Sequence, residues 1–249
     1  MARRDPHPTF LSACLAVLLA AGCGAAPGPG RPQPASGLAP TPAAGSPVVP
    51  GPPGVGTGPA DDPRGRALID RAVAAVRALP AFSLEMPWSQ KQGDQVARGL
   101  YAITGKAPRT TLIHIKEGKG QGTRVLYTGG STAKVRAGGL LGAIAIDLPI
   151  GDERLRSLRG YTIRETDMTA MMAQLANPAH RARIVGTEGT RVRLELSGGP
   201  LLEGCVRMTA DLDTRTGLPV AIRQYDAREA VFTVEMRNMR ARTNVSLSL

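Results

Sequence analysis

The chain has 249 residues, a formal net charge of +11 and an aromatic content of only 3%. Its basic residues are spread singly, with no block of five, so no nucleic-acid partner is expected. Its three histidines and three cysteines are far apart, so neither a metal site nor a cofactor is expected. Many of its 30 glycines and 21 prolines lie in the first quarter, which leaves enough chain for one globular core beyond it.

The chain begins with two arginines, about a dozen apolar residues and a few small residues. This pattern predicts a signal peptide over residues 1–22, because the apolar run is too short to cross about 30 Å of hydrocarbon. The segment Leu19-Ala20-Ala21-Gly22-Cys23 resembles a bacterial lipobox. The resemblance implies that Cys23 carries a lipid. Ordinary cleavage near Ala21, without lipid, is the alternative.

Residues 23–60 consist almost entirely of Gly, Pro, Ala, Ser, Thr and Val, with Arg31 as the single charge. Such a composition offers too little apolar surface to offset the entropy of ordering, so a disordered tether is predicted. At about 3.1 Å per residue it could reach on the order of 100 Å. The protein would then be exported and held at a membrane by its lipid. Gly24, in place of an aspartate, indicates the outer membrane, with the domain facing the periplasm.

The predicted domain, residues 61–249, starts with a helix. Asp61 or Asp62 can cap this helix, Pro63 suits its first turn, and Pro80 ends it. Its apolar residues recur with helical spacing on a single stripe, so we expect the helix to pack on a core. They are Leu68, Ile69, Ala72, Val73, Val76 and Leu79.

From Ala81 onward the apolar period changes to two, which is typical of β-strands. Clean alternation in the last third predicts a sheet with one dry and one wet face, and tight turns between short runs predict antiparallel meander order. The expected strand runs are residues 109–116, 123–128, 132–136, 140–146, 191–196, 205–212, 218–225 and 230–239.

A second helix is predicted between these two groups of strands, with Thr166 or Asp167 as its cap. The residues with helical spacing are Met168, Met171, Met172 and Leu175. Two interpretations of this row stay open. It can be an ordinary core row, or, because methionine is flexible, part of a lid over a variable apolar ligand.

Five segments together form a pattern of turns and strand spacing: Thr123–Arg136, Leu140–Pro149, Leu158–Glu165, Asp213–Val220 and Tyr225–Phe232. Together they resemble an uncharacterised bacterial lipoprotein family in the LolA/LolB-like (lipoprotein carrier) superfamily, over about residues 64–242. The resemblance implies an α+β fold with a curved antiparallel sheet, or half-open β-barrel, an N-terminal helix and a plugging helix. It also implies an arginine that ties the lid to the barrel, although no position can be assigned to it.

In this superfamily the concave side of the sheet is apolar and accepts lipid chains or acylated proteins. The resemblance therefore makes the apolar strand faces and the predicted lid the candidate cavity, although each residue can equally be ordinary core. The candidates are Leu112, Leu126, Val192, Leu194, Val206, Met208 and Ile222 on the strands, and Met168, Met171, Met172 and Leu175 on the helix.

No enzyme is expected, because the chain has no nucleophile elbow, no phosphate-binding glycine loop and no pair of metal ligands. Asp147, Asp152, Glu153 and Glu165 alternate with arginines, which is typical of a solvated loop or an ion-pair network. The favoured function is a membrane-anchored lipoprotein whose domain binds an acyl chain or a lipoprotein in the cell envelope. The alternative is an envelope module for protein interaction or stress sensing, because the same architecture occurs in such sensors.

Overall fold

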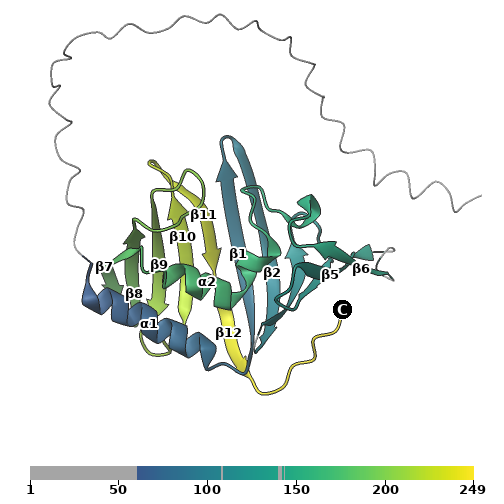
Figure 1. Ribbon diagram of the computed structural model, residues 1–249, viewed down its shortest axis with the longest axis horizontal. Coiled ribbons are helices and arrows are strands. Elements are labelled where there is room, and N and C mark those ends of the chain that lie inside the picture. Colours follow the sequence, from purple (N-terminus) through teal and green to yellow (C-terminus); the bar gives the residue numbers. More distant parts are fainter. Residues whose placement is uncertain (1–60, 108, 140–141, 143) are drawn as a thin grey trace, which may run out of the picture. The chain divides into compact units, whose positions relative to one another are not determined.

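The computed structural model describes residues 61–107, 109–139, 142 and 144–249. The predicted signal peptide, the lipid-attachment residue Cys23 and the tether lie outside the described residues. The described part consists of a large antiparallel sheet with two α-helices on one of its faces (Figure 1). No helix in this part is long and apolar enough to span a membrane.

Helix α1 spans Pro63–Arg77, close to the predicted range. Asp62 caps its start, because the Asp62 carboxylate accepts a hydrogen bond of 2.9 Å from the backbone N–H of Arg64. Pro63 occupies the first turn, where no backbone N–H is needed. The buried stripe of α1 contains Ile69, Ala72 and Val76, and it faces the sheet.

The sheet has twelve strands in the order β6-β5-β4-β3-β2-β1-β11-β10-β9-β8-β7, with β12 also paired to β1. It consists of two meanders joined where β1 pairs antiparallel with β11, and its two end strands, β6 and β7, do not pair with each other. The strands are β1 (Ala81–Gln92), β2 (Gln95–Lys106), β3 (Thr110–Glu117), β4 (Arg124–Tyr127), β5 (Thr132–Arg136), β6 (Ala145–Pro149), β7 (Arg181–Glu188), β8 (Arg191–Ser197), β9 (Arg207–Asp213), β10 (Pro219–Tyr225), β11 (Ala230–Glu235) and β12 (Arg237–Arg242).

This architecture confirms the predicted fold class: an α+β fold with a curved, open antiparallel sheet and an N-terminal helix. The strand runs predicted from 109 onward correspond to β3–β5 and β8–β12, whereas the run predicted at 140–146 overlaps β6 only at residues 145–146, and β7 was not predicted. The single run predicted at 230–239 is divided into β11 and β12, and Asn238 adopts a φ of 54° near the break. For the long hairpin of β1 and β2, the sequence predicted only that the apolar period changes to two from Ala81, without strand bounds.

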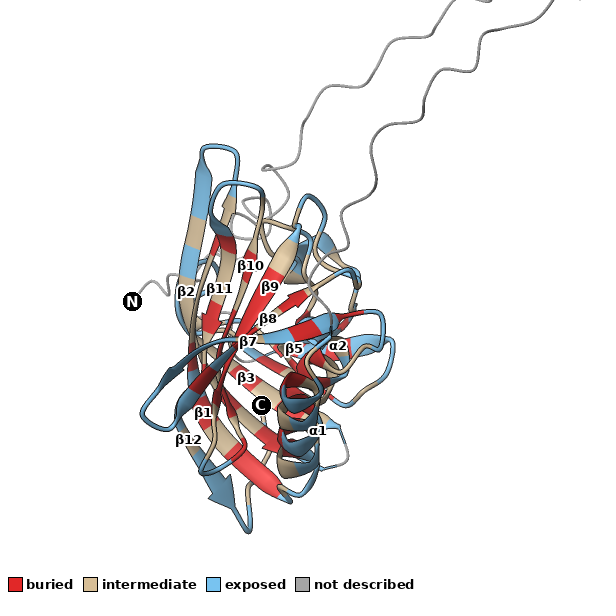
Figure 2. Cartoon of the chain, turned by 90° about the vertical axis from the view of Figure 1, so that its left-hand side faces the viewer, coloured by how far each residue is buried: buried red, intermediate tan, exposed pale blue. Residues whose placement is uncertain are grey.

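One face of the sheet, here called the concave face, carries the core. A row of directly paired residues crosses five strands on this face, and each of its members is at most 8% exposed. The row consists of Leu84, Ile103, Ile113, Val125 and Val135. Helices α1 and α2 cover the concave face, as the band of buried residues beneath them shows (Figure 2).

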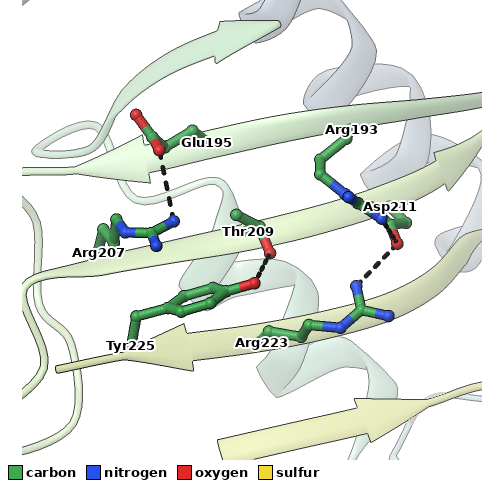
Figure 3. Close-up of polar contacts among 7 residues, drawn as sticks. All are labelled: Arg193, Glu195, Arg207, Thr209, Asp211, Arg223 and Tyr225. Carbon is green, nitrogen blue, oxygen red and sulfur yellow. Dashed lines mark hydrogen bonds and ion pairs between the residues drawn. The ribbon is translucent and has the colours of Figure 1, made fainter. Parts of the chain in front are cut away.

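The opposite, outer face carries charged side chains in cross-strand pairs (Figure 3). Asp211 of β9 accepts hydrogen bonds from Arg193 of β8 at 2.6 Å and from Arg223 of β10 at 2.8 Å. Burial alone would raise the pKa of Asp211, but the hydrogen bonds and charges of both guanidiniums outweigh it and lower that pKa. The guanidinium of Arg207 lies 3.9 Å from the centre of the Tyr225 ring. The outer-face arginines are therefore stabilised within the sheet.

The start of α1 is joined to the edge strand β7. The backbone N–H of Ala182 donates to the Asp61 carboxylate at 2.7 Å, and Arg66 donates to the backbone carbonyl of His180. The His180 ring is 1% exposed, and neither of its nitrogens has a hydrogen-bond partner among the described residues. It packs against Gly199, where a Cβ would lie 2.3 Å from the ring. Burial, and then the charge of Arg66, lowers the pKa of His180.

We expect His180 to make the stability of the protein depend on pH. Because the folded state holds the ring neutral, the unfolded chain binds more protons below about pH 6.5, and the free energy of unfolding falls as the pH falls. One group contributes a slope of at most about 1.4 kcal/mol per pH unit. Urea unfolding of the wild type and of His180→Gln between pH 7 and pH 5 measures this slope, which the substitution should flatten.

His114→Gln is the matched control. The pKa of His114 is also lowered, mainly by burial, but its ring is only half-buried and faces Lys116 and Arg124. This variant should keep most of the wild-type slope. Equal slopes in the wild type and in His180→Gln would show that His180 is not the group that titrates.

Candidate functional site

The candidate site is the apolar space between the concave face and helix α2 (Met168–Leu175). Asp167 caps this helix, because its carboxylate accepts a hydrogen bond of 2.7 Å from the backbone N–H of Thr169. The predicted row of Met168, Met171, Met172 and Leu175 is at most 7% exposed and belongs to the core. In this structure α2 therefore fills the concave side with its own side chains.

Most of the strand residues predicted for the cavity also lie in this core. Val192, Leu194, Met208 and Ile222 are at most 7% exposed and form one cluster with the α2 row. Leu194 and Ile222 both pair with Ala210, so they flank Ala210 from the two neighbouring strands on the concave face. The structure thus brings these residues together, while their role as ligand contacts stays a prediction.

The placement of Leu112 and Leu126 on the dry face was wrong. The two residues pair with each other and are half-buried on the outer face, beside Thr104 and Lys134. Strand β3 is apolar on both faces, so alternation could not show which face is covered. Ile113 pairs with Ile103 and Val125 of the core row, so Ile113 lies on the concave face and its neighbour Leu112 lies on the outer face.

Val206 was also placed wrongly, because its side chain is 56% exposed. It continues the alternation of Met208 in the sequence, but it precedes the first residue of β9, Arg207. The alternation continues in the sequence past the first residue of the strand, so it carries no information on which residues the helices and residues 150–166 cover.

Residues 150–166, here called the strap, form a second cover of the concave face next to α2. The strap contains two short 3-10 turns, Glu153–Leu155 and Ile163–Thr166, and the buried side chain of Ile163 packs in the core. The carboxylate of Glu165 accepts a hydrogen bond of 2.7 Å from the backbone N–H of Thr162, which closes a capping box. Glu165, and Asp152 through its ion pair with Arg154, therefore have local structural partners.

Arg159 ties the strap to both halves of the sheet. Its backbone N–H donates to Gln90 at 3.1 Å, and its guanidinium donates to the carbonyl of Lys91 at 2.8 Å, both on β1. The same guanidinium also donates to the carbonyl of Glu203, which precedes β9. The sequence provides no signal for this role, because Arg159 stands among other arginines and its partners lie far along the chain.

A second contact holds the strap next to Arg159. The ring of Tyr161 stacks on Phe232 of β11, with centroids 4.7 Å apart, and its hydroxyl accepts a hydrogen bond of 2.8 Å from the amide of Gln224. Burial raises the pKa of Tyr161 above its usual value, so the hydroxyl stays protonated. Gln224 is fully buried on the concave face. This polar contact was not anticipated from the sequence.

A cleft of about 280 Å³ opens where α1 ends and α2 begins. Val76, Leu79 and Phe82 form its apolar part, and the first residues of α2 reach it. We call it the α1–α2 cleft. Its remaining lining residues are Arg77, Lys106, Ala107, Arg109, Thr110, Thr111, Asp167 and Thr169. Its volume lies just below the range of typical ligand pockets, about 300–1,000 Å³.

Within the described ranges, no three acidic, histidine or cysteine side chains come together as a set that could hold a metal ion. Cys205 is a half-buried free thiol, and burial raises its pKa.

No family model and no curated protein matches the chain. Among solved structures it is similar to a LolA superfamily protein from Nitrosomonas europaea, with 11% identity and a TM-score of 0.36 over 73% of this chain and 94% of that chain. It is also similar to a putative outer membrane lipoprotein-sorting protein domain from Vibrio parahaemolyticus, with 11% identity and a TM-score of 0.42 over 74% of this chain and 94% of that one.

A third similar structure is the MucA/MucB complex of Pseudomonas aeruginosa, with 14% identity and a TM-score of 0.37 over 71% of this chain and 56% of that chain. At such identities and scores the comparisons assign no ligand, partner or activity to this chain.

We expect Arg159→Ala to loosen the strap. The substitution removes two side-chain hydrogen bonds to backbone carbonyls, so the free energy of unfolding should fall by about 1–3 kcal/mol. Limited proteolysis should then cut within residues 150–166 sooner than in the wild type.

Arg154→Ala is the matched control, because Arg154 lies on the same strap but forms only an exposed ion pair with Asp152. It should cost less than about 1 kcal/mol. Equal effects of the two variants would contradict the role given to Arg159.

Proposed function

We propose that this domain binds the acyl chain of a lipid or lipoprotein between its sheet and helix α2, in the cell envelope. One observation carries the proposal: three methionines of an eight-residue helix fill the concave side, and the α1–α2 cleft opens at the start of that helix. A helix this short is marginal in water and depends on packing. Its flexible methionines can therefore be exchanged for another apolar chain.

Burial of the α2 row and burial of an acyl chain contribute comparable free energies. Burying one large apolar side chain contributes about 1.5–3 kcal/mol, so the four buried residues of α2 contribute about 6–12 kcal/mol. A chain of about 12 carbons contributes about 0.8 kcal/mol for each buried CH₂ group, or roughly 10 kcal/mol. An acyl chain of this length can therefore replace the α2 row without a large net cost. A chain much shorter than this cannot.

Oxidation of methionine by hydrogen peroxide tests the exchange. When the full chain is incubated with 1-lauroylglycerol below its critical micelle concentration, Met168, Met171 and Met172 should be oxidised several-fold faster, because α2 leaves the core. Mass spectrometry of peptides measures the rate at each residue. Met86 and Met208, buried on the sheet at 3% and 0% exposure, are internal controls and should stay protected.

Each result of this experiment has a distinct meaning. Faster oxidation at all five methionines indicates that the amphiphile unfolds the protein. Unchanged oxidation at the three α2 residues, with no lipid on protein purified from membranes, contradicts the proposed function.

The second candidate function is protein binding at the free edge of β6. Ile144 and Ile146 are 70% and 45% exposed there, and β6 ends the described sheet. An unpaired edge with apolar side chains suits an extended peptide that adds as a further strand. The filled concave side favours this function. A stoichiometric protein partner, together with unchanged oxidation of α2, would support it over acyl-chain binding.

We also propose that Cys23 anchors the protein to a membrane through a lipid. Cys23→Ala should leave the thermal unfolding of the domain unchanged and move the protein from the membrane fraction to the soluble fraction. Cell fractionation measures the release from the membrane, and labelling with a radioactive fatty acid measures the loss of the lipid. Cys205→Ala, which changes the single free cysteine of the described residues, should stay membrane-bound and labelled. Membrane association that survives Cys23→Ala, without label in the wild type, would refute the anchor.

A further inference from the structure

The α1–α2 cleft combines an apolar floor with a basic rim. Phe82 and Thr111 belong to a row on the concave face that crosses from β1 to β4 and also contains Gly105 and Tyr127. At Gly105 a Cβ would lie 2.2 Å from the Phe82 ring, so the missing side chain lets the ring lie on the backbone of β2. The floor of the cleft is therefore continuous with the core that α2 covers.

The rim of the cleft carries Arg77, from the last turn of α1, and Lys106 and Arg109, which flank the turn between β2 and β3. All three side chains are exposed. Among the described residues, none of the three forms an ion pair or a side-chain hydrogen bond. The favourable position of a cation at a helix C-terminus explains Arg77 in part. It explains neither Lys106 nor Arg109.

The one acidic residue in the lining, Asp167, offsets only part of the charge of the three cations. Asp167 is 6% exposed, and its carboxylate is engaged by the first turn of α2, where it accepts the hydrogen bond from Thr169. On the outer face, by contrast, Arg193 and Arg223 share the carboxylate of Asp211. The cleft lining therefore combines three exposed cations at its edge with an apolar floor.

We infer that the α1–α2 cleft receives the anionic head group of a single-chain amphiphile, whose acyl chain continues under α2. This inference rests on the proposed function and adds the class of ligand. The hydroxyls of Thr110 and Thr169 line the same cleft and can donate to a carboxylate or phosphate oxygen. Because the rim is exposed, its charges act in a high dielectric and select among ligands, while the buried chain supplies most of the affinity.

The test compares dodecanoate and dodecyl phosphate with the uncharged 1-lauroylglycerol, by equilibrium dialysis against the full chain at low ionic strength. The wild type should bind the two anions about tenfold more tightly than the neutral ligand. The triple variant Arg77→Glu, Lys106→Glu, Arg109→Glu should lose this preference and still bind 1-lauroylglycerol. High salt should reduce the preference of the wild type, because it screens exposed charges. A preference for only one anion identifies the head group as carboxylate or phosphate.

The matched control carries the same change of charge elsewhere. Arg98, Lys116 and Lys119 are also exposed and form no ion pair among the described residues, but they lie outside the cleft. Their triple change to glutamate should keep the preference for anions. If a reversed rim prevents folding, the neutral variant Arg77→Gln, Lys106→Gln, Arg109→Gln replaces it and should also lose the preference.

The outcomes separate the inference from the proposed function. Equal binding of charged and neutral ligands by the wild type overturns the inference and leaves acyl-chain binding intact. An equal loss in the control variant also overturns it, because the effect would then come from the overall charge. If none of the three ligands binds, both the inference and the proposed function fail.

Discussion

One constraint determines the rest of the structure. The sheet is open, and no second sheet among the described residues covers its apolar face. Strands β6 and β7 end the sheet without pairing, so closure of a barrel does not bury this face. Each large side chain left in water would cost about 1.5–3 kcal/mol. Helices α1 and α2 and the strap all lie on the concave face because each removes part of this surface from water.

The same constraint underlies the proposed exchange of α2 for a ligand. Helix α2 has eight residues, and packing on the concave face keeps it folded. Any apolar group that buries a similar area competes with it for this face. The neighbouring strap is also packed through Ile163 and Tyr161, but Arg159 adds directional hydrogen bonds to distant backbone carbonyls, which α2 does not have among the described residues. This difference favours α2 as the part that moves when a ligand binds.

The basic residues of the protein lie in two kinds of environment, and the net charge of +11 does not distinguish them. On the outer face, Arg193, Arg207 and Arg223 pair with carboxylates or aromatic rings of neighbouring strands, and they stabilise the sheet (Figure 3). At the α1–α2 cleft, exposed cations have no such partners among the described residues. An arginine that pairs with a neighbouring strand stabilises the sheet, whereas an exposed cation without such a partner is a candidate for ligand binding. The number of arginines in the sequence does not show this difference.

The sequence alone determined the local elements, namely α1, α2 and most of the strands, together with the antiparallel order, because period, capping residues and turns depend on neighbouring residues. The row of Met168, Met171, Met172 and Leu175 was found in this way. The tertiary structure decided what depends on distant partners. It put Leu112 on the outer face through its strand register, left Val206 exposed, and joined Arg159 to a strand 68 residues away. It also formed the cleft from five elements, α1, β1, β2, β3 and α2, because contacts between distant segments follow from packing and leave no periodic pattern in the chain.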